Sequence, residues 1–299
     1  MGLAVIALLA LSVPETALPG DDTSQVAILE SSRDQASGRE LAAILNNLGT
    51  VYWDLARLRD AQKAFERSLA IRDSLGETGT REVARTLNNL GIVYTDLQNL
   101  SKAEEIIARA ATLHEKLQGD DPGLAHSWLN LGNIYRAERR WDEAESMFRK
   151  LLDLDRRGAA KRDVAMASNN LGVLLRERGS SPEAEALLTR AVSIWEGEVG
   201  PQHPLVATAL NNLGVLYTRT GELDRAQTAF ERAIRIAEQA LPPDHPSLAD
   251  YRASYASLLR KLDRKKEARQ LETLARSAQE QHARANLLGH TVDARQFPK

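Results

Sequence analysis

Apolar residues recur at helical spacing along most of the chain. One stripe consists of residues at i, i+3, i+4 and i+7, namely Leu45, Leu48, Gly49 and Tyr52. This spacing predicts an amphipathic helix that buries one face against a partner. No segment alternates cleanly between apolar and polar residues, and β-branched residues are sparse, so we expect an all-α protein.

A second stripe with a different pattern follows the first. It places a small, a large and a small residue at i, i+4 and i+7, as in Ala61, Phe65 and Ser68. The later copies are Ala103, Ile107 and Ala110; Ala144, Phe148 and Leu151; Ala184, Leu188 and Ala191; and Ala226, Phe230 and Ala233. This pattern lets one bulky side chain insert between closely packed neighbours. We therefore predict that each unit is a pair of helices.

The paired stripes repeat six times in near-constant register. Variants of Leu-Asn-Asn-Leu-Gly occur at 45–49, 87–91, 128–132, 168–172 and 210–214, and Tyr255-Ala256 marks a degenerate sixth copy. The five glycines and Ala256 are separated by 42, 41, 40, 42 and 42 residues. Because no single hairpin can bury its apolar stripe alone, this spacing predicts one stacked array rather than separate domains.

Glycine is unexpected at the centre of the first helix of each unit. It costs about 1 kcal/mol relative to alanine in a helix interior. Glycine nevertheless recurs at this position in five of the six units. This predicts that the second helix approaches so closely that a Cβ would clash. Proline marks the starts of several helices, as in Ser181-Pro182, His203-Pro204 and His245-Pro246. These prolines suit the first helical position.

The repeated pattern resembles the tetratricopeptide repeat. The match rests on bulky-x-x-Leu-Gly-x-x-Tyr, with Gly49 and Tyr52, followed by Ala-x-x-x-Phe, with Ala61 and Phe65, and on their copies. The period is longer than the 34 residues typical of that family. Together with the Asn-Asn pair and His203-Pro204, it is similar to the kinesin-light-chain-like subgroup, which is widespread in bacteria. The resemblance implies an α-solenoid of about six stacked helix-turn-helix units in a right-handed superhelix.

The resemblance also divides the chain. We expect a candidate signal peptide and linker over 1–22, a linker or capping helix over 23–38, the repeat array over 39–281 and a tail over 282–299. In the sixth unit Arg252 replaces the bulky apolar residue and Glu272 replaces phenylalanine. A polar outer face is what a terminal capping repeat needs. The ending at 258–262 is typical of the close of such arrays, so we expect the C-terminus to be complete.

Charge and composition argue against several functions. Lys and Arg number 39 and Asp and Glu number 41, which gives a net charge of -2. A dedicated nucleic-acid binder needs a basic excess, so none is expected here. The chain has no cysteine, which excludes disulfides and thiolate nucleophiles.

The search for catalytic and metal-binding motifs returns nothing. The sequence has no Gly-rich phosphate loop, no GxSxG motif and no HExxH motif. His203 and His245 stand in Pro-bounded loops, where turn chemistry explains them better than metal binding does. We expect no enzyme, no cofactor and no metal.

The N-terminus allows two interpretations. Residues 2–13 are apolar and Pro14 ends the run. The run is too short for a membrane-spanning helix, which takes about 20 residues, so no integral membrane span is expected. Its length suits the core of an export signal with cleavage near 13–18, which would place the protein in the periplasm or outside the cell. No Lys or Arg precedes the run, however, which also fits a misplaced start codon or an apolar N-terminal helix of a cytoplasmic protein.

The resemblance implies protein or peptide binding in a concave groove lined by the first helices. The residue three before each glycine projects about 100° away from the core stripe. It is an asparagine in four units: Asn46, Asn88, Asn169 and Asn211. A ladder of amides could hold the backbone of an extended peptide, since each amide both donates and accepts. The alternative is that these residues bond to neighbouring helices, and we favour that role for the second asparagines: Asn47, Asn89, Asn130, Asn170 and Asn212.

Charge along the predicted groove is uneven. Asp54 and Asp96 lie near the first units, whereas the later units carry Arg136, Arg176 and Arg219, followed by Arg260 and Lys261. Cations at these positions would favour an acidic partner segment, although an ordinary solvated face explains them equally well. We therefore expect a scaffold or adaptor that binds another protein. The alternative is a sensor that controls a partner enzyme through opening and closing of the solenoid.

Overall fold

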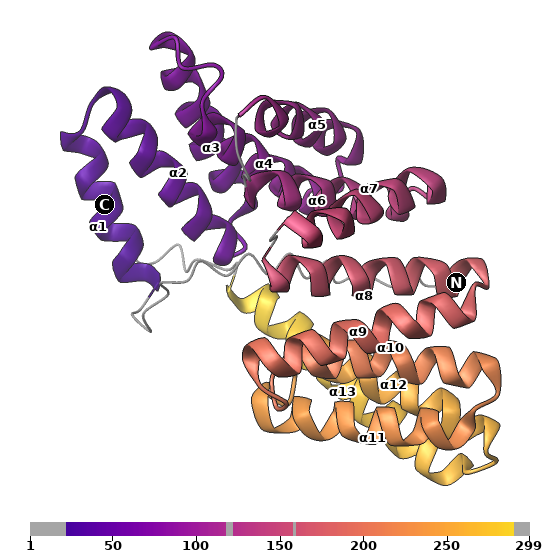
Figure 1. The fold of residues 1–299 in the computed structure, drawn as a ribbon. Coiled ribbons are helices and arrows are strands. Elements are labelled where there is room, and N and C mark those ends of the chain that lie inside the picture. The colour runs from indigo at the N-terminus through magenta and orange to yellow at the C-terminus, as the bar shows by residue number, and fades with distance from the viewer. Residues whose placement is uncertain (1–21, 118–121, 158–159, 290–299) are drawn as a thin grey trace. The chain divides into compact units, whose positions relative to one another are not determined.

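The computed structural model describes residues 22–117, 122–157 and 160–289, and these residues are helical almost throughout (Figure 1). The helices are α1 (Asp22–Gln35), α2 (Gly38–Asp54), α3 (Leu58–Ser74), α4 (Arg81–Asp96), α5 (Leu100–Lys116), α6 (Pro122–Ala137), α7 (Trp141–Asp153), the 3-10 turn η1 (Leu154–Arg157), α8 (Lys161–Arg178), α9 (Ser181–Val199), α10 (Pro204–Thr220), α11 (Leu223–Ala240), α12 (Pro246–Lys261) and α13 (Lys265–Gly289). No strand occurs in the described ranges. The predicted all-α class is confirmed.

Consecutive helices pair as the two stripes predict. The first helices of the six units are α2, α4, α6, α8, α10 and α12, and each is followed by its second helix. Each second helix also packs on the first helix of the next unit where both lie in one compact part, as α3 does on α4. The chain divides into two compact units, Met1–Asp163 and Val164–Lys299. Within each of them the hairpins stack on one another.

The recurring glycines mark close contacts between the two helices of a unit. A Cβ added at Gly91 would lie 2.2 Å from Cγ1 of Ile107, and one added at Gly49 would lie 2.6 Å from Cε1 of Phe65. Gly132, Gly172 and Gly214 meet the bulky residue of their own second helix in the same way. These distances confirm the expected close approach. Ala256 takes the glycine's place in the sixth unit, where Glu272 stands instead of the large apolar residue.

Tyrosines on the first helices bond back to the preceding helix. The hydroxyl of Tyr217 donates to Glu185 on α9 at 3.0 Å, and that of Tyr255 donates to Glu231 on α11 at 2.9 Å. Tyr52 bonds in the same way to Glu30 at 2.5 Å, so α1 occupies the place of a preceding second helix. Val26 of α1 is buried in the same core as Leu48 of α2. This helix therefore packs on the first unit in the way that a second helix packs on the next first helix.

The sixth unit closes the other end differently from the sequence-based expectation. Arg252 does not lie on an outer polar face: its side chain is buried and one guanidinium nitrogen lies 3.0 Å from Glu238 of α11. Ala249 of α12 packs against Ala275 and Ala278 of α13, so small residues fill this part of the contact between the two helices. The last helix, α13, continues to Gly289, past the expected end of the array at residue 281.

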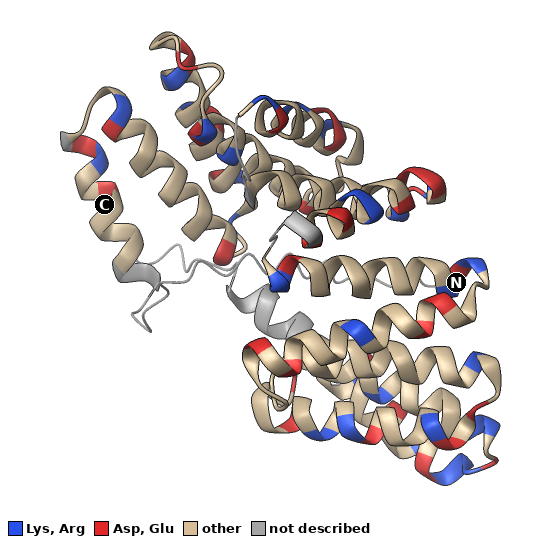
Figure 2. Ribbon diagram, in the orientation of Figure 1, with Lys and Arg blue, Asp and Glu red and all other residues tan. Residues whose placement is uncertain are grey.

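Charge is distributed unevenly between the two kinds of helix. In α2, α4, α6, α8 and α10 the charged residues stand toward the helix ends, which leaves a central uncharged segment (Figure 2). The second helices carry both signs along their length. No helix of the described residues is long and apolar enough to cross a membrane. Residues 2–13, the candidate export segment, lie outside the described residues.

Candidate functional site

Three of the four candidate asparagines lie at the junction between neighbouring first helices. Asn46, Asn88 and Asn169 are buried, with exposed fractions of 4%, 8% and 8%, and Asn211 is partly exposed. The central segments of α2, α4 and α6 pack side by side, as do those of α10 and α12. The amides of these asparagines are therefore more enclosed than a free groove lining would be.

The side-chain oxygens of these asparagines accept hydrogen bonds from the next unit. Asn130 donates its amide to Oδ1 of Asn88 at 3.2 Å, and Asn212 donates to Oδ1 of Asn169 at 2.9 Å. Oδ1 of Asn46 accepts from the hydroxyl of Thr86 at 2.9 Å. The result is a polar ladder that ties successive first helices together. The second asparagine of the repeat contributes to it at Asn130 and Asn212, as the role favoured for it implies, but not at Asn89.

In Asn46 and Asn88 the ladder uses the amide oxygen and leaves the Nδ2 donor without a partner in the described part of the chain. The Nδ2 atoms of Asn46 and Asn88 have no acceptor among the described residues, whereas Nδ2 of Asn169 donates to Asn170 at 3.1 Å. Oδ1 of Asn211 is buried and receives no hydrogen bond. From the sequence we expected each of these asparagines to offer both its amide donor and its amide acceptor to a ligand. In the structure their oxygens are bonded or buried, so they cannot offer both. Asn46 and Asn88 can still donate to a backbone carbonyl.

The three candidate arginines differ in surroundings. Arg219 on α10 is exposed and has no partner among the described residues. The side chain of Arg176 on α8 is only 13% exposed and lies 3.8 Å from Glu177. Arg136 stands on α6, in the first compact unit. Arg260 and Lys261 already have partners within the chain. Arg260 bonds to Glu272, and Lys261 donates to the backbone carbonyl of Thr218 at 3.0 Å.

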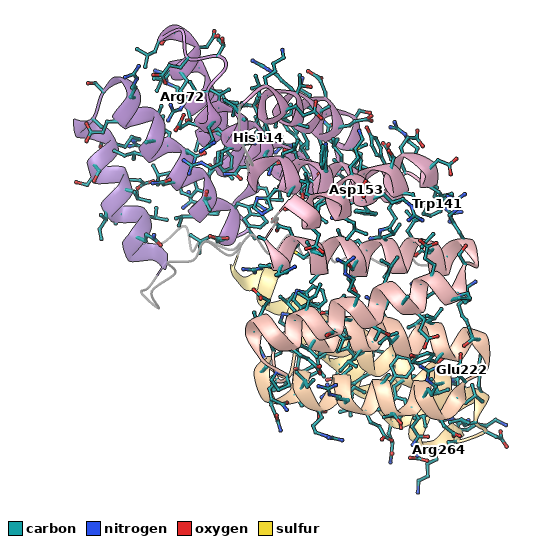
Figure 3. All side chains as sticks on the ribbon, viewed as in Figure 1. Arg72, His114, Trp141, Asp153, Glu222 and Arg264 are labelled. Atoms are coloured by element: carbon teal, nitrogen blue, oxygen red, sulfur yellow. The ribbon has the colours of Figure 1, made fainter. Side chains whose placement is uncertain are left out.

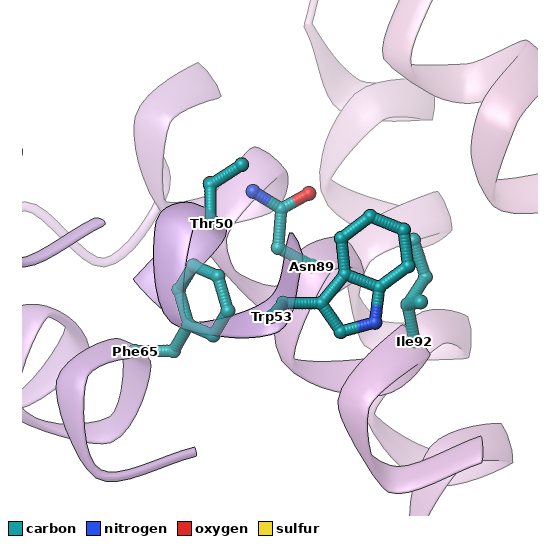
Figure 4. Close-up of a pocket in the computed structure, with 5 residues that line it drawn as sticks. All are labelled: Thr50, Trp53, Phe65, Asn89 and Ile92. Atoms are coloured by element: carbon teal, nitrogen blue, oxygen red, sulfur yellow. The ribbon is translucent and has the colours of Figure 1, made fainter. Parts of the chain in front are cut away.

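A hollow between α2 and α4 is a feature that the sequence reasoning missed. Thr50, Trp53, Phe65, Asn89 and Ile92 line about 250 Å³ of space, including its open mouth (Figure 4). Nε1 of Trp53 donates to Oδ2 of Asp96 on the neighbouring helix at 2.6 Å. The hollow adjoins the asparagine row, because Thr50 follows Asn46 by one helical turn and Asn89 follows Asn88 directly. Its only sequence signal is a tryptophan where the second and fifth units have threonine.

His203 and His245 cap the starts of α10 and α12. Nδ1 of His203 accepts from the backbone N–H of Leu205 at 3.2 Å, and Nδ1 of His245 accepts from that of Ser247 at 3.1 Å. His114 is also buried, against Gly123, and Figure 3 labels it on α5. No group of three or more potential metal ligands occurs in the described part of the chain. The turn role expected for His203 and His245 is confirmed.

Comparison with known proteins agrees with this geometry. A family model described as tetratricopeptide repeat matches residues 82–157 and 163–239, and a second model of the same description matches 41–77. No curated protein matches in sequence.

Among similar solved structures is BtubC (BKLC) from P. vanneervenii, which is 20% identical, with 94% of this chain and 97% of that chain covered and a TM-score of 0.60. A putative kinesin light chain repeat protein from Podosopora anserina is 19% identical, with 68% and 98% covered and a TM-score of 0.55. A Rap protein complexed with Competence and Sporulation Factor is 15% identical, with 87% and 81% covered and a TM-score of 0.66. These likenesses show a shared fold.

Proposed function

The chain belongs to the tetratricopeptide repeat family, and on that basis we propose that it is a scaffold or adaptor that binds an extended segment of another protein along the face formed by its first helices. The observation that carries this proposal is the uncharged central segment of α2, α4 and α6, with Asn46 and Asn88 on the first two of these helices. Nδ2 of Asn46 and of Asn88 is free to donate to backbone carbonyls. Such contacts hold a peptide backbone with little regard to its sequence.

The comparisons support binding rather than catalysis. Tetratricopeptide repeats are typically non-enzymatic scaffolds, and the similar Rap structure is a complex with Competence and Sporulation Factor. A sensor that changes shape on binding is the second candidate function, and the similar solved structures include a quorum sensor, NprR from B. thuringiensis. X-ray scattering with and without a bound partner separates the two functions, because only a sensor changes its radius of gyration when the partner is added.

The later units favour an acidic stretch of the partner. Arg219 offers an unpaired guanidinium, and Arg136 and Arg176 occupy the corresponding ends of α6 and α8. A guanidinium binds a carboxylate through two parallel hydrogen bonds, which gives Arg an advantage over Lys here. Each exposed pair of an arginine and a carboxylate contributes only about 0.2–1 kcal/mol to binding. The preference for an acidic segment therefore requires the three arginines together.

Affinity capture from the native source, followed by binding measurements, tests the proposal. We expect the triple change Arg136→Glu, Arg176→Glu and Arg219→Glu to weaken a captured partner more than about tenfold at low salt and much less at high salt, because the lost attraction is screened. The matched control is Lys63→Glu with Arg67→Glu and Lys266→Glu, three exposed cations on second helices. An equal loss in both sets would contradict the acidic-segment assignment.

A further inference from the structure

The hollow between α2 and α4 has the features of a side-chain subsite. Its walls come from two helical stripes that face each other: Thr50 and Trp53 at i, i+3 on α2, and Asn89 and Ile92 at i, i+3 on α4. Phe65 of α3 forms part of the lining, although that ring is itself only 1% exposed. The hollow is partly open to solvent, and its volume of about 250 Å³ includes the mouth. Because its lining is mainly apolar, we match it to one aliphatic side chain that lies against the indole.

The indole of Trp53 is fixed at the edge of this hollow. Its Nε1–H donates to Oδ2 of Asp96 on the neighbouring helix at 2.6 Å. This bond joins the C-terminal ends of two successive first helices and holds the ring in one orientation. A wall fixed in this way leaves the hollow open without a ligand, so little ordering cost is expected when a side chain enters.

The carboxylate of Asp96 has no basic side chain beside it among the described residues. Asp96 is exposed, it continues the α4 stripe one turn after Ile92, and no Lys or Arg of the described residues pairs with it. Desolvation by its surroundings raises the pKa of this carboxyl above its usual value. Its second oxygen, Oδ1, accepts no hydrogen bond. A cation beside the hollow would pair with this carboxylate.

Asn89 supplies the remaining polar group. The corresponding residues Asn130 and Asn212 donate to the asparagine of the preceding unit, but Thr86 takes that role toward Asn46. Asn89 makes no such bond, and its amide has no partner among the described residues. It can both donate to and accept from the backbone of a peptide whose side chain fills the hollow.

The corresponding positions in the other units do not reproduce this set. Between α4 and α6 they hold Thr95 in place of Trp53 and Ala137 in place of Asp96. Between α10 and α12 they hold Thr218 and Lys261, and Lys261 bonds to the Thr218 carbonyl. The combination of aromatic wall, free amide and unpaired acid is thus a property of one place in this chain.

We infer that this hollow is a specificity subsite for a peptide that carries an aliphatic side chain next to a Lys or Arg, with the aliphatic group between Trp53 and Ile92, the cation on Asp96 and the backbone on Asn89. The inference rests on the proposed peptide-binding function and adds a sequence preference to it. It also assigns the first two units a basic partner segment, whereas the later arginines favour an acidic one.

Selection of a phage-displayed library of random dodecapeptides on the full chain tests the inference. We expect enrichment of an aliphatic residue adjacent to Lys or Arg. Synthetic peptides with that pair should bind Asp96→Asn at least about fivefold more weakly, because asparagine keeps an acceptor for Trp53 but loses the charge. Asn89→Ala should weaken them about threefold or more. The matched controls, Glu105→Gln on α5 and Asn47→Ala on α2, should bind as the wild type does.

The outcomes separate the subsite from the broader proposal. Enriched peptides that lack the pair, or that bind Asp96→Asn and Asn89→Ala as well as the controls, overturn the subsite and leave peptide binding in place. Failure to enrich any peptide, with natively folded protein by circular dichroism, counts against both. Enrichment of acidic peptides whose binding depends on Arg219 alone supports the broader function and overturns the subsite.

Discussion

At the residue scale, glycine and its large neighbour form a matched pair. Gly91 faces Ile107, which is fully buried, and a Cβ there would approach Cγ1 to 2.2 Å. We expect Gly91→Leu to destabilise the protein by several kcal/mol, about 3 or more, because the contact cannot open without moving a helix. Chemical denaturation measures the change. A melting temperature within a degree or two of wild type would show that the helices can separate at low cost.

The tyrosine hydroxyls should make stability sensitive to alkali. Burial, the largest cause, raises the pKa of all six tyrosines, and the pKa of Tyr52, Tyr217 and Tyr255 reaches about 12 because each of these hydroxyls also donates to a glutamate. Since the folded pKa values exceed the ordinary value of about 10, the stabilisation is complete below pH 10 and is lost as pH rises toward 12. Tyrosinate absorbance should therefore be small in the native protein at pH 10. Half-ionisation at that pH would contradict the assigned bonds.

At the element scale, helix starts in the later units depend on histidine. His203 and His245 each accept a backbone N–H at the start of α10 and α12. We expect His203→Ala to cost about 1 kcal/mol, the usual effect of losing an N-cap, and His203→Asp to retain most of the stability because its carboxylate accepts the same N–H. Urea unfolding compares the two variants. Equal losses for Ala and Asp would mean that the imidazole acts through packing instead.

The pairing of helices could be predicted from the sequence, but the hydrogen-bond partners of the asparagines could not. The glycine period and the positions of Ala61 and Phe65 predict which helices pair and how closely, because both depend on contacts within a unit. The partners of Asn46 and Asn89 depend on contacts between units: Thr86 donates to Oδ1 of Asn46, whereas Asn89 does not. The bond from Trp53 to Asp96 likewise joins side chains 43 residues apart. Spacing along the chain gives no register for such pairs.

At the scale of the whole molecule, stability is spread over many local contacts. Each hairpin packs on its neighbours within Met1–Asp163 or within Val164–Lys299. An array of this kind behaves as a chain of nearest-neighbour couplings, so unfolding should depart from two-state behaviour. We expect the calorimetric enthalpy to exceed the van't Hoff enthalpy. Close agreement of the two would indicate a single cooperative unit and contradict this account.

The most direct test of the central claim is where a captured partner binds. Asn46→Asp with Asn88→Asp keeps an oxygen acceptor for Thr86 and Asn130 and removes both free amide donors. Because the new carboxylates are buried, circular dichroism must first show that the double variant keeps the native helicity. We predict at least a tenfold rise in the dissociation constant for this pair, and no change for Lys63→Glu with Arg67→Glu on α3, whose side chains are exposed. Unchanged affinity for the asparagine pair together with loss of binding in the α3 pair would place the partner on the second helices and contradict the account.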